Sequence, residues 1–215
     1  MDDITTKLEK IDINNKSKKT LYYSVSIDYI EVINILNKIL SLDDYNKYFF
    51  GIKTETGYDI DDKPYSETFE KIKEDASIDS KYLAFIDKMK TGEKFIIYDN
   101  TFYIANSEFH ITTLFTGGKP HEKSEFVEKE VGSNVLIKIN KLGISNNFIT
   151  LGVETIKLED GNEIQYFGND VKHITIGLNK TGKKVFPKDS YTALTDGKIF
   201  DVDFTLEGLT NRVYQ

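Results

Sequence analysis

The chain has 215 residues and a formal charge of −7, from 28 basic and 35 acidic side chains. A chain of this length usually forms one large domain or one domain with an insertion, and a hydrophobic content of 39% is enough for a packed core. The absence of cysteine excludes disulfides, zinc–thiolate sites and cysteine nucleophiles. The acidic balance argues against a protein that coats DNA or RNA through a broad basic surface, but a small phosphate ligand needs only a local basic field.

No stretch approaches the ~18 consecutive apolar residues of a membrane span, and the acidic N-terminus lacks the apolar region of a secretory signal. We therefore expect a cytoplasmic protein without a membrane partner, and a monomer is favoured. Charge is distributed unevenly along this chain. Residues 41–80 hold eleven acids and five lysines, whereas residues 171–190 hold five lysines and one aspartate.

The first third of the chain shows a polar arm, a strand and a helix. Residues 1–19 are polar and lysine-rich, which predicts a flexible N-terminal arm. Residues 21–27 are β-branched and aromatic, as in a strand, and apolar residues at near-helical spacing predict an amphipathic helix over 29–41. Residues 42–65 contain acids, two glycines and a proline, and they are typical of a loop with short turns.

Two more helices are expected before the pattern changes to strands. One helix is predicted over 66–76 and another over 80–90, where Gly92 would end it. A hairpin follows over 95–98 and 102–104, with Asp99 and Asn100 in its turn. The later strands are predicted at 109–115, 135–140, 148–156, 173–178 and 199–206, with 143–147 joining the second of these to the third. The fold class is therefore α+β, as a single domain over 20–215 with an acidic, partly helical insertion at about 42–93.

Two of the three histidines begin the same short motif, His-Ile-Thr, and both copies lie on predicted strands. Residues 109–115 read FHITTLF and residues 172–178 read KHITIGL. Side chains at i and i+2 point to one face of a strand, so His110 lies beside Thr112, and His173 lies beside Thr175. The same alternation predicts Ile111 and Phe115 on the opposite face of the first strand. In the second strand, it predicts Ile174, Ile176 and Leu178 on the buried face and Gly177 beside the histidine and threonine.

Two such strands lying side by side would place two imidazoles and two hydroxyls around a single site. This set suits metal-free transfer of a phosphoryl group from an ester, because one imidazole takes a proton from the attacking group and the other donates a proton to the leaving oxygen. Threonine hydroxyls would donate hydrogen bonds to the non-bridging oxygens of the phosphate. The alternative is a purely structural role, in which two half-buried histidines donate hydrogen bonds to nearby carbonyl groups.

Paired His-x-Thr strands in a chain of this size resemble the two-histidine (2H) phosphoesterase superfamily. Around the second motif, residues 172–176 and 182–187 look most like the cyclic-phosphodiesterase domain of plant and fungal tRNA ligases, and Gly117, Gly118 and Lys119 after the first motif are similar to that branch. The resemblance implies a bilobal fold, with concave antiparallel β-sheets around a central cleft and helices outside. It also implies hydrolysis of 2′,3′-cyclic phosphates of nucleotides or RNA ends, as in RNA repair, with no metal and no cofactor.

Carried over position by position, the resemblance makes His110 and His173 the acid–base pair, with Thr112 and Thr175 as phosphate holders. Phe115, Lys119 and Lys183 are further candidates for substrate contact. Two other functions stay open. The same chemistry would serve a signalling oligonucleotide, such as a cyclic di- or trinucleotide or a 2′,5′-oligoadenylate, and a non-catalytic phosphate-binding interaction module would keep the same cleft.

Three weaker patterns are not assigned a function. Gly177, Gly182 and Lys183 approach a phosphate-binding P-loop, but Lys184 replaces its Ser/Thr. Asp59, Asp61 and Asp62 approach a calcium loop that lacks its required glycine. His121 lies in a polar loop, where we expect it to be solvated.

Overall fold

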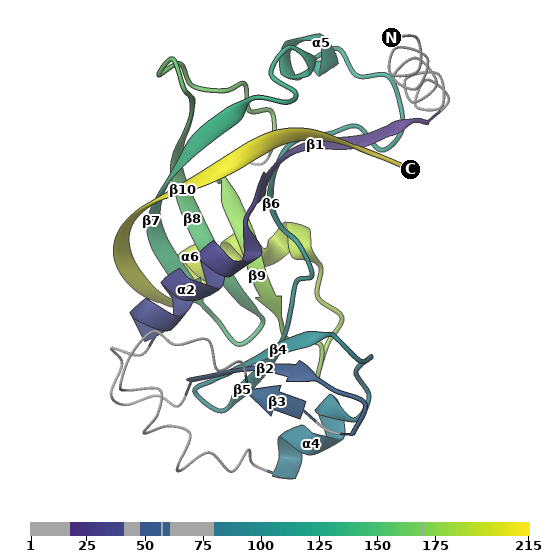
Figure 1. The fold of residues 1–215 in the computed structure, drawn as a ribbon, viewed down its shortest axis with the longest axis vertical. Coiled ribbons are helices and arrows are strands. Elements are labelled where there is room, and N and C mark those ends of the chain that lie inside the picture. Colours follow the sequence, from purple (N-terminus) through teal and green to yellow (C-terminus); the bar gives the residue numbers. More distant parts are fainter. Residues whose placement is uncertain (1–17, 41–47, 57, 61–79, 169) are drawn as a thin grey trace, which may run out of the picture.

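The protein is built on one large antiparallel sheet with few helices, which confirms the α+β class (Figure 1). The structure is a computed structural model that describes residues 18–40, 48–56, 58–60, 80–168 and 170–215. Ten strands form the sheet in the order β3-β2-β4-β5-β9-β8-β7-β10-β1-β6. Their bounds are β1 Thr20–Ile27, β2 Tyr48–Lys53, β3 Tyr58–Ile60, β4 Lys94–Tyr98, β5 Thr101–Ala105, β6 Phe109–Phe115, β7 Asn134–Ile144, β8 Phe148–Leu158, β9 His173–Leu178 and β10 Lys198–Tyr214.

The helices are short, except for the one that follows β1. The α-helices are α2 Tyr29–Leu40, α4 Ser80–Ile86, α5 Ser124–Glu128 and α6 Ala193–Asp196, and a 3₁₀ helix, η1, covers Pro187–Thr192. None of the helices in the described part of the chain is long and apolar enough to span a membrane.

The β1–α2 unit forms as the sequence predicts. The Asp28 carboxylate caps α2, because it accepts the backbone N–H groups of Ile30 and Glu31 at 2.7 and 3.0 Å. One face of α2 is buried in the main core, with Val32 and Leu36 fully enclosed. The helical spacing of apolar residues therefore identified the face that packs on the sheet.

The region predicted as loop over 42–65 is partly strand, so that prediction was wrong where the structure describes it. β2 pairs with β4 and carries β3 on its other edge. Strand formation here depends on pairing with β4, some forty residues further along the chain, which the local composition does not reveal. The predicted helix over 66–76 and most of the predicted arm over 1–19 lie outside the described residues.

The remaining predicted elements are present with altered bounds. The helix predicted over 80–90 ends at Ile86, earlier than expected, and turns lead from it to β4. The β4–β5 hairpin has Asp99 and Asn100 at φ of 44° and 59°, the left-handed conformation that tight two-residue hairpin turns require. β7 and β8 run on to a connection at 145–147, and the last strand is far longer than the predicted 199–206.

Strands β6 and β9 carry the two motifs and lie in contact, although they are far apart in the order of the sheet. β5 pairs with β9, and only residues 106–108 connect β5 to β6. Asn106 fastens this connection to β9, because its backbone N–H donates to Ile176 O and its side-chain amide donates to Thr175 O, both at 2.9 Å. The fold thus brings the first motif next to the second.

Candidate active site

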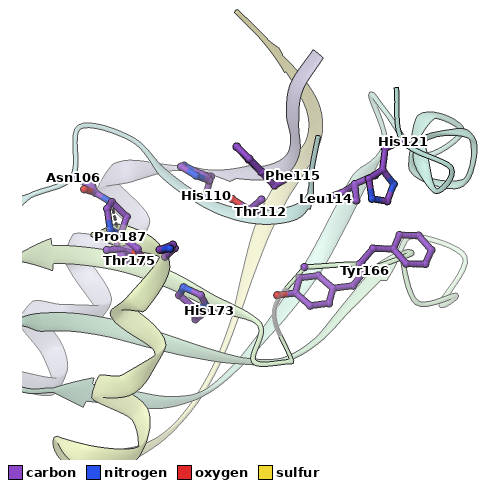
Figure 2. Close-up of a pocket in the computed structure, with 13 residues that line it drawn as sticks. Asn106, His110, Thr112, Leu114, Phe115, His121, Tyr166, His173, Thr175 and Pro187 are labelled. Atoms are coloured by element: carbon purple, nitrogen blue, oxygen red, sulfur yellow. Dashed lines mark hydrogen bonds between the residues drawn. The ribbon is translucent and has the colours of Figure 1, made fainter. Parts of the chain in front are cut away.

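Both His-x-Thr pairs line one cavity of about 450 Å³. His110 and Thr112 reach it from β6, and His173 and Thr175 reach it from β9. Figure 2 shows the pair from β6 and the pair from β9 on opposite sides of the cavity. The expected convergence of the two motifs is therefore present in the structure.

A register shift in β6 alters the predicted faces of the first motif. Opposite β1, Thr112 pairs with Ser24 but Leu114 pairs with Tyr23, so Thr113 is an extra residue in the ladder. An extra residue of this kind is a β-bulge, and it exchanges the faces of the residues that follow. Phe115 consequently lies on the side of His110 and lines the cavity with its side chain 63% exposed, not on the opposite face as the alternation predicted.

The second motif has a matching shift. Ile149 pairs with Gly177 but Thr150 pairs with Thr175, so Ile176 is the extra residue of β9. A side chain at Gly177 would point at Tyr103 and Ile149, both buried. Gly177 therefore lies on the opposite face from His173 and Thr175, which corrects the prediction that they share a face.

The two extra residues serve the cavity in the same way. The carbonyl of Thr113 accepts the backbone N–H of Phe167 at 2.8 Å, and the carbonyl of Ile176 accepts that of Asn106 at 2.9 Å. Phe167 and Asn106 both line the cavity. In each motif, the residue after the threonine thus holds a neighbouring segment of the cavity wall in place.

His173 is held by its own backbone. Its Nδ1 lies 2.9 Å from Val171 O, and because a carbonyl only accepts, Nδ1 carries a proton and donates it. Neutral His173 therefore has its lone pair on Nε2. Burial lowers the pKa of His173 below 6.5, and the carbonyl groups of Val171 and Pro187 act against that shift.

Tyr166 is a neighbour of His173 through a shared acceptor. Its hydroxyl also donates to Val171 O, at 3.3 Å. Burial, helped by the charge of Asp170, raises the pKa of Tyr166 to about 12. The hydroxyl therefore stays protonated near neutral pH and acts as a donor.

His110 has different surroundings. Its ring stacks on Tyr22, with centroids 5.4 Å apart and planes 20° apart. Burial lowers the pKa of His110 below 6.5, the nearby Glu108 carboxylate raises it, and His173 lowers it further. Burial thus favours the neutral form of both imidazoles.

Thr175 is positioned by a buried serine. Its hydroxyl lies 2.6 Å from the hydroxyl of Ser190, which is fully buried, and 3.3 Å from Pro187 O. Thr150 in turn donates to Ser190 O at 2.8 Å. If Ser190 donates to Thr175, the Thr175 hydroxyl donates its proton to Pro187 O, and a ligand oxygen would compete with that carbonyl for it. Through these bonds, η1 orients Thr175 of the second motif.

The other predicted contact residues divide into two groups. Phe115 lines the cavity, whereas Lys119 and Lys183 are exposed and are not among the residues that line it. His121, expected to be only solvated, does line it. The sequence reasoning missed several further wall residues, among them the four side chains of Asn106, Tyr166, Phe167 and Lys188.

A sequence signal existed for only one of those four. Lys188 belongs to the basic segment at 171–190, whereas Tyr166 and Phe167 lie in an irregular stretch without periodicity. Gly168 passes close to the first motif, because a Cβ there would lie 2.9 Å from Thr112 O. Over the described parts of the chain, no group of three or more histidine or acidic side chains could hold a metal ion.

Comparison with known proteins gives little further information. No protein-family model matches the sequence, and no curated protein matches it significantly. Among solved structures, the crystal structure of a fungal RNA kinase is similar, with 14% identity and a TM-score of 0.42. The similarity covers 93% of this chain and 46% of that chain, so this chain spans about half the length of the kinase. A likeness of this degree does not define the activity.

Proposed function

We propose that the protein is a phosphodiesterase that hydrolyses 2′,3′-cyclic phosphates of nucleotides or RNA ends by general acid–base catalysis with two histidines and without a metal ion. One observation carries the proposal, namely that both His-x-Thr pairs line the same cavity. The resemblance of these motifs to the 2H phosphoesterases points the same way. Residues 20–215 would then form one bilobal domain of that type, with 42–93 as an insertion and 1–19 as a flexible arm.

The reaction requires two proton transfers, one from the attacking water and one to the leaving ribose oxygen. A neutral imidazole accepts a proton from water as the water oxygen attacks phosphorus, and the bond from phosphorus to one ribose oxygen breaks. The other imidazole, protonated, gives its proton to that oxygen, which leaves a phosphate monoester and a free hydroxyl. For His173 the proton moves through Nε2, because Nδ1 is bonded to Val171 O. Hydrogen bonds from Thr112 and Thr175 to the non-bridging oxygens stabilise the charge that develops on them.

Separate replacement of the two histidines tests the acid–base assignment. His110→Ala and His173→Ala should each lower turnover of a nucleoside 2′,3′-cyclic phosphate at least about 10²-fold, the lower range for a positioned acid or base. Circular dichroism and thermal unfolding of each variant show whether the fold is kept. Wild-type turnover in either folded variant would refute the assignment.

Thr112→Ala and Thr175→Ala should cost roughly 1–3 kcal/mol of transition-state stabilisation each.

A substrate panel tests the specificity. The panel contains nucleoside 2′,3′-cyclic phosphates, linear 2′,5′- and 3′,5′-oligonucleotides and cyclic dinucleotides, each assayed with and without EDTA, and phosphorus NMR identifies the product isomer. We expect the cyclic phosphates to be the best substrates and EDTA to have no effect. Preference for a linear or cyclic oligonucleotide would instead identify a signalling substrate. Binding without turnover of any substrate would identify a non-catalytic module.

A further inference from the structure

The loop that follows the first motif returns a third histidine to the cavity. After β6 the chain reads TGGKPHEK over 116–123, and His121 of this loop lines the same cavity as His110 and His173. The chain after β9 brings another donor to the cavity, because Lys188 directly follows Pro187 at the start of η1 and lines the cavity too. Each motif strand is therefore followed by a segment in which a proline precedes a hydrogen-bond donor at the cavity wall.

These two donors lie at opposite ends of the site. Figure 2 shows His121 at one end and Pro187 at the other, with His110, Thr112 and His173 between them. Pro187 O accepts a hydrogen bond from Thr175, so the Lys188 end belongs to the reacting phosphate. The His121 end is separate from the acid–base pair.

The His121 ring is oriented by its own loop. Its Nδ1 accepts the backbone N–H of Lys123 at 3.1 Å, so a neutral ring carries its proton on Nε2 and can donate it. Lys119 and Lys123 in the same loop add two positive charges and Glu122 adds one negative charge, so the loop is net positive; the Lys123 ammonium group lies 3.9 Å from the Glu122 carboxylate. The Lys123 ammonium group lies 5.6 Å from the ring centroid of Phe167, a wall residue. An imidazole donor beside two lysines matches an anionic oxygen ligand.

The wall between the reacting end and His121 is aromatic. Figure 2 shows Phe115 and Tyr166 there, and Phe167 lines the same cavity. Aromatic rings are sequence-tolerant surfaces for stacked bases. A volume of about 450 Å³ falls within the range of sites that hold ligands well above the size of a phosphate ion. The site thus has room for a nucleoside between two phosphate-binding ends.

We propose that His121 binds a second phosphate of the substrate, on the 5′ side of the nucleoside whose cyclic phosphate reacts. This inference rests on the proposed function and narrows it. The preferred substrate is the end of an oligonucleotide, or a nucleotide with a 5′-phosphate, and not a nucleoside that bears only the cyclic phosphate.

Two matched substrates isolate the second phosphate. They are a nucleoside 2′,3′-cyclic phosphate with a 5′-hydroxyl and the same nucleoside with a 5′-phosphate. We expect wild-type kcat/KM to be at least tenfold higher for the 5′-phosphorylated substrate. In His121→Ala this ratio should fall close to one, and His121→Gln should restore part of it because glutamine keeps an N–H donor. Lys129→Gln, an exposed charge change in the same β6–β7 connection, serves as the control and should keep the full ratio.

Binding measurements separate failure of this inference from failure of the proposed function. Calorimetry with a nucleoside 3′-phosphate and the corresponding 3′,5′-bisphosphate needs no turnover. Equal affinities, together with equal kcat/KM for the two cyclic substrates, would overturn the second-phosphate site and leave the phosphodiesterase standing. A ratio that His121→Ala leaves unchanged would also overturn the role of His121. Tighter binding of the bisphosphate that depends on His121, without hydrolysis of either cyclic substrate, would refute the phosphodiesterase and support the site.

Discussion

His110 and His173 share a sequence motif but differ in their surroundings. A backbone carbonyl fixes the tautomer of His173, whereas His110 stacks on Tyr22 and lies within the field of Glu108. The sequence predicted both histidines, and the threonine that lies beside each of them, from two short motifs. The tautomer of His173 and the ring that stacks on His110 were not predictable, because they depend on backbone geometry around Val171 and on Tyr22 of β1, a strand that is remote in sequence.

Replacing Glu108 should reveal the role of His110. Burial keeps the pKa of both histidines below 6.5, so the bell-shaped pH profile of kcat/KM should have its maximum on the acidic side of neutrality. Because the Glu108 carboxylate stabilises the charged form of His110, Glu108→Gln should lower the pKa of His110 further. One limb of the profile should then move to lower pH. Movement of the alkaline limb identifies His110 as the acid, and movement of the acidic limb identifies it as the base.

The control for this experiment is Glu154→Gln, an exposed change on β8, which should leave both limbs in place. If Glu108→Gln also left both limbs unchanged, the carboxylate would have no influence on His110, contrary to its position two residues before that histidine.

Along the two motif strands, side chains alternate between the two faces of the sheet as predicted from the histidine to the threonine, but not beyond it. The alternation placed His110 with Thr112 and His173 with Thr175 on the cavity side, but the extra residues Thr113 and Ile176 reversed what followed. A bulge is defined by the pairing of two strands, so the alternation of residues within one strand does not reveal it. The same reason explains why β2 was taken for a loop, since its pairing with β4 is not encoded locally.

Asn106 couples the two motif strands, and its replacement should affect activity more than stability. Asn106→Ala removes the amide bond to Thr175 O and keeps the backbone bond to Ile176 O. The loss of stability should be about 1 kcal/mol, as for one hydrogen bond. Turnover should fall by tenfold or more, because displacement of a reacting group by about 1 Å costs on the order of 10²-fold. Chemical denaturation and steady-state kinetics measure the two effects.

Asn179 provides a control away from the cavity. Its amide nitrogen donates to Asn146 O at 2.7 Å, its amide oxygen accepts two bonds from Thr181, and it does not line the cavity. Asn179→Ala removes more hydrogen bonds than Asn106→Ala and should nevertheless leave turnover unchanged. Equal turnover in the two variants would show that the bond from Asn106 does not position the second motif.

Across the whole molecule, one buried cluster joins both sides of the site. It includes Ile111 of β6, Ile174 of β9 and Leu206 of β10. β10 pairs with β7 through one half and with β1 through the other, so it links the strands around both motifs (Figure 1). Composition alone predicted a core of sufficient size, but not that a single strand would serve both sides of it, because pairing partners depend on contacts that are remote in sequence.

Two leucines of β10 test this shared core. Leu206 is 0% exposed and Leu209 is 42% exposed. Leu206→Ala should lower the free energy of unfolding by about 2–5 kcal/mol, whereas Leu209→Ala should cost less than about 1 kcal/mol. Urea unfolding followed by circular dichroism and by tyrosine fluorescence should give the same midpoint for Leu206→Ala. Two separated transitions would contradict a core shared by both sides of the site.

The short connection from β5 to β6 has an evolutionary and practical consequence. Through the sheet, the first motif reaches the second only by way of β1, β10, β7 and β8, whereas residues 106–108 span the same gap directly. Lengthening that tether by even one residue would widen the gap between the imidazoles and leave every ladder of the sheet intact. Insertions there should therefore yield well-folded proteins with impaired turnover, and a screen for restored turnover should recover second-site changes in the strands of the longer route.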